Sequence, residues 1–380
     1  MKFVIAPDKY KGSLSGQQFC EAVSKGLLQV FPNAVIVHKP LADGGDGIIE
    51  VVKDYLGAVT VNTLVKDPLF NLIKAPYLYS VSKKTAFIEM SEASGYKLLA
   101  GNKTNCRHTT TLGTGELIVD ALDKGAETIV LGIGGSATND GGMGIAVALG
   151  YDFLDENGMA LAPIGENLIS EKKIGHKSVH PQLKHVNFKI ACDVNNPFHG
   201  RNGAAHVYAS QKGASEDDVI FLDKGLQHFA AVLRETFNIE VQDIPGSGAA
   251  GGVGGGAVVF LNAELNSGID LIKDIADFDS AIEQANWIIT GEGKLDSQTF
   301  AGKTISGVVS AAKKFNVPVA AFCGIIELTI DEQKQMGITY AASILKNLSD
   351  LEKAKQEAYF NLEFMAFNFA NILKRDITLV

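Results

Sequence analysis

The chain has 380 residues, 46% of them apolar and 20% charged, which is ordinary for a globular protein with a well-buried core. This length favours two domains. The formal net charge of −9, without a basic stripe, argues against nucleic-acid binding. No secretory signal and no apolar run of ~18 residues is found, so we expect a cytoplasmic protein that does not span a membrane. The four cysteines are widely separated, which is typical of reduced thiols and not of a zinc site or a disulfide framework.

The N-terminal segment alternates a strand with a helix twice. Residues 3–7 form a short apolar run of strand length, and Ser15 with Gln18 makes a capping box before apolar residues at helical spacing. Residues 34–43 predict a second strand. A second apolar helix face over residues 48–56 ends at Gly57. This alternation predicts a parallel sheet with helices on its faces.

The middle of the chain has a different pattern. Residues 67–88 predict shorter strands joined by turns, which favours antiparallel pairing. A helix over residues 117–122 ends at Gly125, a buried strand from residue 128 runs into a glycine loop, and a helix surrounds residues 222–233. We expect this part to form a mixed α/β domain.

The last hundred residues return to the first pattern. Strands are expected at residues 287–290, 317–325 and 339–345, with a helix face over residues 305–312 and a helical tail over 351–373. We therefore predict a doubly wound domain made by both chain ends, residues 1–66 plus 285–380, with the mixed α/β domain, residues 67–284, inserted between them.

Six loops combine glycines with carboxylates, amides or hydroxyls, each at the end of a predicted strand. In open α/β sheets ligands bind at the carboxyl ends of strands, where such loops gather. Turn formation alone explains many single glycines, but six such loops in one chain indicate a ligand site. The loops cover residues 6–15, 41–47, 132–142, 191–204, 245–256 and 290–304.

Two of these loops have the features of a phosphate site. Phosphate binding needs backbone N–H groups that no side chain obstructs, often at the start of a helix. We expect the loops at 132–142 and 245–256 to bind the phosphates of a nucleotide cofactor. The residues assigned to this role are Gly134, Gly135, Ser136, Thr138, Asn139, Gly246, Ser247 and Gly248.

Three standard fingerprints fail. Gly246, Gly248 and Gly251 match G-x-G-x-x-G, but no βαβ unit surrounds them and the glycine-rich segment that follows is poor at starting a helix. Gly302-Lys303-Thr304 looks like the end of a Walker A loop, yet Ser297 stands where its first glycine is required. No G-x-S-x-G elbow is present. The chain is therefore neither a P-loop enzyme nor a typical dinucleotide-binding protein by sequence.

Carboxylates accompany the glycines in nearly every loop, as metal-assisted phosphoryl transfer requires. Asp193 follows a strand and precedes Asn195 and Asn196, which suits an oxygen-rich metal site. Asp296 lies beside Lys294 in another strand-end loop. For any single carboxylate, including Asp8, Asp140 and Glu292, capping or turn formation explains the residue about as well as catalysis does.

Together these loops resemble the type I glycerate kinase family. The matching motifs are APDKYKGSLS, ADGGDG, GTGELI, GIGGSATNDGG, ACDVNNP with GRNGAAHVYASQKGA, GSGAAGGVGGG and TGEGKLDSQTFAGK, in the family's order from residue 6 to residue 304. The resemblance implies a flavodoxin-like domain and transfer of a phosphoryl group from ATP, with Mg²⁺, to D-glycerate. The 2-phospho product is typical of such members. ADGGDG departs from the more usual ADGGEG but keeps the carboxylate.

On this resemblance we expect the site in the cleft between the two domains. Asp193 and Asp296 are assigned to metal binding and hydroxyl activation, in either order, and Lys294 to catalysis. Lys9, Lys11 and Lys294 are expected to hold the glycerate carboxylate or to neutralise the transferring phosphate. The full set of predicted substrate residues is Asp8, Lys9, Lys11, Ser13, Asp43, Asp46 and Ser297.

Two alternatives stay open at this point. A kinase of a related hydroxy acid such as tartronate would carry the same loops. A non-catalytic sensor of an organic acid or nucleotide would need fewer carboxylates than the chain has. The sequence leaves open 2- versus 3-phosphorylation and the oligomeric state.

Overall fold

The computed structural model of the chain describes residues 1–8, 10, 12–42, 48–99, 105–296, 304–347 and 350–377. Contacts divide the chain into a first unit, Met1–Tyr55 with Gly268–Val380, and a second unit, Leu56–Ser267. The boundaries predicted from sequence, 66/67 and 284/285, lie later in the chain. They differ because strand β3 (Val59–Lys66) pairs with the second unit, whereas helices α8 (Gly268–Ile275) and α9 (Phe278–Ile282) pack on α10 (Thr304–Phe315) of the first.

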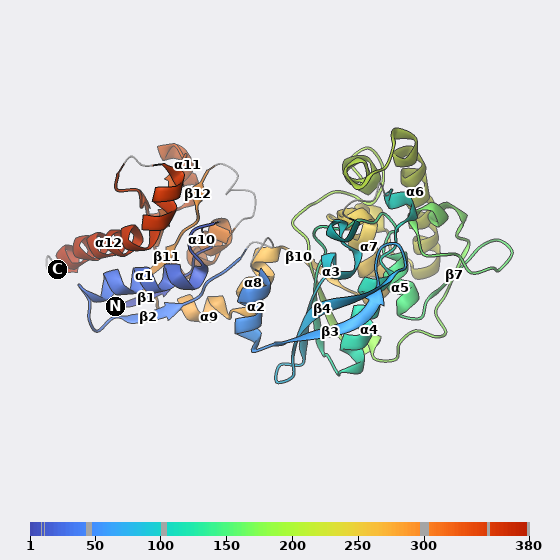
Figure 1. The fold of residues 1–380 in the computed structure, drawn as a ribbon, viewed down its shortest axis with the longest axis horizontal. Coiled ribbons are helices and arrows are strands. Elements are labelled where there is room, and N and C mark those ends of the chain that lie inside the picture. Colours follow the sequence, from blue (N-terminus) through green and yellow to red (C-terminus); the bar gives the residue numbers. More distant parts are fainter. Residues whose placement is uncertain are drawn as a thin grey trace. The chain divides into compact units, whose positions relative to one another are not determined.

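The first unit contains a five-stranded parallel sheet in the order β2-β1-β11-β13-β15 (Figure 1). Numbered within this unit, that order is 2-1-3-4-5, the flavodoxin-like arrangement. The predicted flavodoxin-like sheet built from both chain ends is therefore confirmed. Its strands are β1 (Lys2–Ile5), β2 (Val35–His38), β11 (Trp287–Thr290), β13 (Val319–Cys323) and β15 (Tyr340–Ser343).

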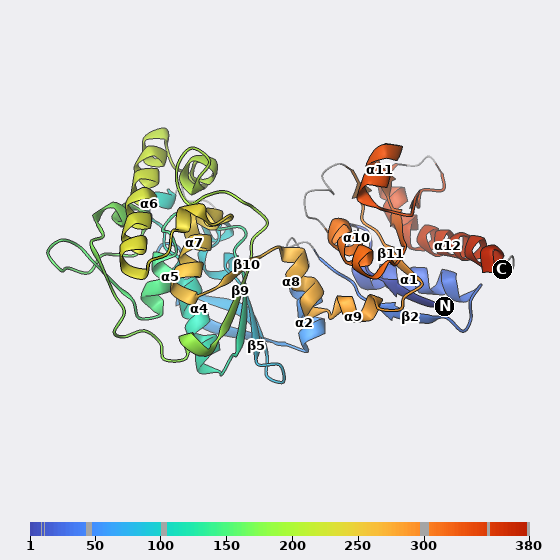
Figure 2. The same ribbon diagram turned by 180° about the vertical axis from the view of Figure 1, so that it is seen from behind.

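Helices cover this sheet because its strands are apolar on both faces. Phe3 and Ile5 share a core with helices α1 (Gly16–Leu28) and α12 (Leu351–Ile377), while the alternate residue Val4 is equally buried. The predicted capping box of Ser15 and Gln18 starts α1. Helices α1 and α12 lie side by side (Figures 1 and 2). The remaining elements are α2 (Ile48–Leu56), α11 (Ile330–Met336) and the short parallel pair β12 (Lys294–Leu295) and β14 (Ile325–Ile326).

The second unit is built on a six-stranded sheet in the order β10-β9-β6-β5-β4-β3. The pairs β3–β4 and β4–β5 are antiparallel, as predicted for residues 67–88, and the other pairs are parallel. The predicted mixed α/β character is therefore confirmed. Beyond β3, the strands are β4 (Leu72–Ser80), β5 (Thr85–Glu89), β6 (Thr128–Gly132), β9 (Asn187–Ala191) and β10 (Glu264–Asn266), with a separate hairpin of β7 (Asp152–Leu154) and β8 (Lys173–Gly175).

Two cores hold the second unit together. One joins the sheet to helix α4 (Leu112–Asp123) and helix α7 (Ala249–Leu261). The other surrounds helix α6 (Glu216–Phe237), where Phe153, Phe229 and Phe260 form aromatic contacts with ring centroids 5.7–6.3 Å apart. Helices α3 (Ser91–Ser94) and α5 (Met143–Ala148) also belong to this unit (Figure 1). Among the described residues, no helix has the length and apolar character needed to cross a membrane.

The start of helix α7 agrees with one expectation, and its remainder does not. The glycine-rich segment after Gly248 was expected to be poor at starting a helix, and residues 250–252 are not helical, but the chain is helical beyond them. Ala250, Gly251 and Gly252 have φ angles of 54°, 73° and 90°, so the chain is kinked there and continues as a helix to Leu261. Close packing of the glycines against neighbouring backbone compensates for their low helix propensity.

Candidate functional site

In the first unit, a carboxylate follows each of the two strands that flank the switch point of the sheet. Strands β1 and β11 are neighbours, and the chain leaves β1 toward β2 on one side and β11 toward β13 on the other. Asp8 follows β1, and its N–H donates a 2.9 Å hydrogen bond to the carbonyl of Gly291, just after β11. The next residue is Glu292. Open α/β sheets bind ligands at this point, so Asp8 and Glu292 are placed where ligand chemistry is expected.

Hydrogen bonds tie the loops after β1, β11 and β13 to one another. The Tyr10 hydroxyl donates to the carbonyl of Phe322 at 2.6 Å, and burial raises the pKa of this phenol well above its ordinary value. The N–H of Gly324 donates to the carbonyl of Glu292 at 3.2 Å. The loop backbones at this edge are therefore held together before any ligand binds.

Lys294 lies between two carboxylates at the same edge. Its Nζ is 2.7 Å from an oxygen of Glu327 and 3.5 Å from an oxygen of Asp296. The hydrogen bond to Glu327 raises the pKa of the Lys294 ammonium, and the side chain is about half exposed (48%). The predicted neighbours Lys294 and Asp296 are therefore brought together, with the cation accessible to an anionic substrate.

Of the other substrate residues predicted in the first unit, the structure describes Ser13. The Ser13 hydroxyl donates a 2.9 Å hydrogen bond to the carbonyl of Lys355 in α12, which gives Ser13 a structural role. The remaining predicted positions lie outside the described residues; they are Lys9, Lys11, Asp43, Asp46 and Ser297.

In the second unit, the last residues of four parallel strands form one row across the sheet. Glu89 pairs in register with Gly132, Gly132 with Ala191, and Ala191 with Asn266. Residues in one row point to the same face. A Cβ at Gly132 would lie 2.6 Å from Oε2 of Glu89, so a larger residue here would displace the Glu89 carboxylate. The row places the Glu89 carboxylate at the edge from which the glycine loop after β6 departs.

Glu89 was not predicted from the sequence, because only carboxylates in glycine-rich loops were considered as site residues. Burial, with a smaller contribution from the nearby Glu92, raises the pKa of Glu89 to about 7. A carboxylate with a pKa near neutrality suits a general base that takes a proton from a hydroxyl. The sequence feature that could have indicated Glu89 is its position as the acidic last residue of a mostly apolar strand, TAFIE.

The turn after β6 is open to solvent. Gly134 and Gly135 are exposed, and nothing lies within 4 Å of a Cβ built on Gly134. Within the described part of the chain, we find no acceptor for the N–H groups of Gly134 and Gly135, which form a turn between Ile133 and Ser136. Successive free N–H groups in a turn form an anion-binding concavity. The predicted phosphate role of Gly134 and Gly135 agrees with this geometry.

The second glycine loop is different, because its predicted phosphate residues are buried. Ser247 has no exposed surface, and the same is true of Thr138 and Asn139, farther along the first loop. Gly246 and Gly248 are buried as well, and a Cβ on Gly248 would collide with the carbonyl of Pro197. The glycines of residues 246–256 thus serve close packing of backbone against the loops at 138–142 and 196–197. The structure therefore does not present this loop as an open phosphate cradle.

The carboxylate of Asp140 is buried and joins Thr111 to the turn before α5 by hydrogen bonds. It accepts four hydrogen bonds, from the N–H and hydroxyl of Thr111 at 2.8 Å each and from the N–H groups of Gly142 and Gly144 at 3.2 Å. Burial raises the pKa of Asp140 and these hydrogen bonds oppose the shift. The sequence left open whether Asp140 caps a helix or turn or takes part in catalysis. Its hydrogen bonds give it the structural role, in the turn before α5.

The two predicted metal ligands belong to different units. Asp193 is exposed in the second unit and Asp296 is partly buried in the first. In the residues that the structure describes, no three His, Cys, Asp or Glu side chains gather as a metal site. Mg²⁺ commonly takes only one or two protein carboxylates and completes its shell with substrate phosphate and water. One or two of the carboxylates of Asp8, Glu292 and Asp296, which follow β1, β11 and β12, fit that type of site.

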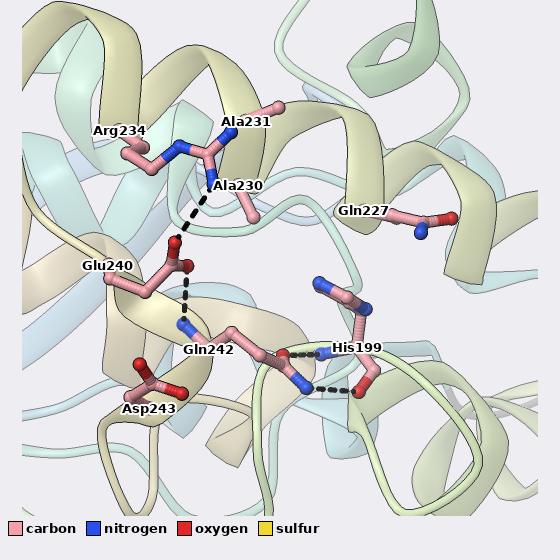
Figure 3. Close-up of a pocket in the computed structure, with 8 residues that line it drawn as sticks. All are labelled: His199, Gln227, Ala230, Ala231, Arg234, Glu240, Gln242 and Asp243. Atoms are coloured by element: carbon pink, nitrogen blue, oxygen red, sulfur yellow. Dashed lines mark hydrogen bonds and ion pairs between the residues drawn. The ribbon is translucent and has the colours of Figure 1, made fainter.

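A separate hollow of about 400 Å³ in the second unit is shown in Figure 3. Its polar groups bind one another: Arg234 contacts Glu240 at 3.3 Å, and the Gln242 side chain bonds both the N–H and the carbonyl of His199 at 3.0 and 3.1 Å. It includes His199 from one glycine loop but no carboxylate that was predicted to act in the site. We therefore place the candidate site at the strand ends and not in this hollow.

Comparison with known proteins gives one consistent result. The chain matches the model of the glycerate kinase family over residues 3–374. It is 42% identical to a glycerate kinase of Bacillus cereus and 41% identical to a glycerate 2-kinase of Escherichia coli, in each case over 98% of both chains. Its structure is similar to a crystal structure described as glycerate kinase 2 from Salmonella typhimurium LT2, with a TM-score of 0.87 and 37% identity over 100% of this chain and 99% of the other.

Proposed function

We propose, because this chain belongs to the glycerate kinase family, that it transfers the terminal phosphoryl group of ATP to a hydroxyl of D-glycerate. The observation that carries the proposal is the similarity over the full length of relatives named for this activity. The open turn after β6 and the carboxylates after β1 and β11 support it, since one offers N–H donors to phosphate and the others suit a magnesium-bound substrate.

In the second unit, we assign the phosphates of ATP to residues 134–136. The backbone N–H groups of Gly134 and Gly135 lack acceptors among the described residues, and the glycines allow a phosphate to approach the backbone. The predicted contributions of Thr138, Asn139, Gly246, Ser247 and Gly248 become supporting ones, because these residues pack beneath the surface and hold the turn in shape.

In the first unit, we assign Mg²⁺ to one or two of the carboxylates of Asp8, Glu292 and Asp296. When bound, Mg²⁺ would offset the negative charge of the phosphates. We assign Lys294 to the glycerate carboxylate, because its half-exposed ammonium can exchange Glu327 or Asp296 for a carboxylate of the substrate. Lys9 and Lys11 keep their predicted role in the same task.

Removal of the hydroxyl proton needs a carboxylate near the acceptor. Asp193 and Asp296 keep their predicted roles in metal binding and hydroxyl activation, in either order. Glu89 is a further candidate for hydroxyl activation, because its raised pKa suits proton transfer near neutral pH. We propose attack by the 2-hydroxyl, in line with the name of the Escherichia coli relative.

A coupled assay of ADP release tests this function. Purified chain with ATP and Mg²⁺ should release ADP quickly only after D-glycerate is added, and tartronate at matched concentration should give a lower kcat/KM. Asp296→Asn, if folded, should lose most of this activity. ADP release that does not depend on glycerate would contradict the proposal.

A further inference from the structure

A buried ammonium lies beneath the open turn after β6. Lys212 ends a short helical turn, η6 (Ser210–Lys212), and only 6% of its surface is exposed. Its Nζ donates a 2.7 Å hydrogen bond to the Ser136 hydroxyl and a 2.9 Å hydrogen bond to the carbonyl of Thr138. In the described ranges we find no carboxylate within ion-pair distance of this Nζ. Burial of an ammonium without a paired carboxylate is costly, so its position calls for a reason.

The turn above Lys212 is shaped to receive a negative charge. Gly135 has a φ of 69°, which favours glycine, and both Gly134 and Gly135 are exposed in this turn. Ser136 accepts its hydrogen bond from Lys212, so the serine's own proton is free to be donated to a group on the open side. The ammonium, the hydroxyl and the turn thus form a chain of donors that ends at the exposed surface.

We propose that Lys212 provides the positive charge for a phosphate group of the nucleotide bound at residues 134–136, acting through the hydroxyl of Ser136. Lys212 is a positioning residue in this account, since it reaches the phosphate through another side chain. That the anion is a nucleotide phosphate rests on the proposed kinase function. That the turn binds an anion rests on its free N–H groups and on the buried ammonium.

The groups that face Lys212 make its protonation sensitive to a bound anion. Burial lowers the pKa of Lys212 to about 8, a shift that the charge of Asp140, from the loop after β6, partly opposes. Cys106 from η2 (Cys106–His108) also faces Lys212. Burial raises the pKa of Cys106 to about 11, so this thiol stays neutral at the pH used below. Asp140 is already bracketed by four hydrogen bonds. An added phosphate should therefore raise the pKa of Lys212, and the protein should take up a proton.

Calorimetry of ADP binding tests this proposal without any turnover. At pH 8.5 with Mg²⁺, titrations in two buffers of different ionisation enthalpy give the number of protons bound with ADP. Wild-type protein should take up on the order of half a proton or more, because a lysine with a pKa near 8 is mostly neutral at that pH. Lys212→Met should abolish the uptake and weaken ADP binding by at least about tenfold.

Two further variants separate charge from folding. Lys212→Arg keeps the charge but does not titrate, so it should retain most of the affinity and lose the proton uptake. Lys273→Met removes another buried ammonium, in the first unit, where Lys273 pairs with Asp270 at 2.8 Å; it should leave ADP binding and proton uptake unchanged. If Lys212→Met does not fold by circular dichroism, the wild type and Lys212→Arg still decide the question.

The contrary outcomes are distinct. Wild-type ADP affinity and proton uptake in folded Lys212→Met would overturn the role of Lys212, as would an absence of uptake in wild-type protein. Lys212-linked uptake in a protein that does not phosphorylate glycerate would support this inference and overturn the proposed function. Glycerate phosphorylation without any such uptake would leave the function intact and overturn this inference alone.

Discussion

The carboxylate of Asp8 accepts a 2.8 Å hydrogen bond from the hydroxyl of Thr304, the first residue of α10. The two residues are 296 positions apart in the chain, and the contact joins the loop after β1 to the helix that follows β11 and β12. A negative charge at the start of a helix is favoured by the helix dipole. The hydrogen bond from Thr304 holds the Asp8 side chain in place at the switch point of the sheet, and the helix dipole favours its ionised form.

Asp8→Asn should abolish most activity without unfolding the protein. Asparagine keeps the size of the side chain and an oxygen that can accept from Thr304, but it loses the charge needed for Mg²⁺. We expect kcat/KM for glycerate to fall by about 100-fold or more, with a nearly unchanged melting temperature. Asp279→Asn, which removes an exposed carboxylate paired with Lys314, is the matched control and should keep wild-type kinetics. Near wild-type turnover in Asp8→Asn would reject this role.

Gly134→Ala and Gly135→Ala should have opposite effects on stability. Nothing lies within 4 Å of a Cβ at Gly134, so alanine there should leave the free energy of unfolding unchanged or slightly raised. Alanine at Gly135, with its φ of 69°, should lower that free energy by about 1–2 kcal/mol. Both should raise KM for ATP, because a methyl group obstructs the turn. An unchanged KM for ATP in Gly134→Ala would show that phosphate does not approach this backbone.

Glu89→Gln should stabilise the protein at neutral pH and reduce its activity. Burial raises the folded-state pKa of Glu89 to about 7, above the ordinary 4.5, so the folded state holds the proton more tightly than the unfolded state. Its stabilising effect is present below about pH 4.5 and is lost as the pH rises to about 7. Glutamine cannot ionise, so the variant does not lose this stability as the pH rises. Its free energy of unfolding at pH 7 should exceed that of the wild type by about 1–3 kcal/mol. Denaturant titrations at pH 5 and pH 7 would measure the difference.

The control for Glu89 is Glu171, between η3 (Gly165–Ser170) and β8. Burial also raises the pKa of Glu171 to about 7, but this residue is not in the row of strand ends that contains Glu89. Glu171→Gln should stabilise the protein in the same pH range and keep full turnover. Equal turnover in both variants would remove Glu89 from the proposed chemistry.

Asp140→Asn should lower stability, because an amide N–H₂ replaces one acceptor oxygen of a fully buried carboxylate. At least one of the four donors, from Thr111, Gly142 or Gly144, then faces another donor. We expect the free energy of unfolding to fall by about 1–3 kcal/mol, measured by urea titration. A loss of activity with undiminished stability would contradict the structural role.

The sequence predicted the fold well where periodicity and caps are local signals. The capping box at Ser15 and the alternation of strands and helices led to the observed flavodoxin-like sheet. The unit boundaries were misplaced because β3 and α8 have ordinary amphipathic patterns, and only their pairing and packing partners decide which unit they join.

The site was predicted in part, for a similar reason. Glycine serves both an open turn, as at Gly134, and a close backbone contact, as at Gly248, and the sequence does not distinguish the two. Lys212 was missed because its partner Ser136 is 76 residues away. Glu89 was missed because its neighbours in the row, Gly132 and Ala191, come from strand register and not from a motif.

Phosphorus NMR of the reaction tests the central claim most directly. Purified chain is incubated with ATP, Mg²⁺ and D-glycerate, and the proton-coupled spectrum is followed with time. We predict growth of a phosphomonoester signal split into a doublet by the single proton on carbon 2, in step with loss of the terminal phosphate of ATP and with growth of ADP. A spectrum in which only inorganic phosphate and ADP appear, or in which ATP persists, would contradict the account.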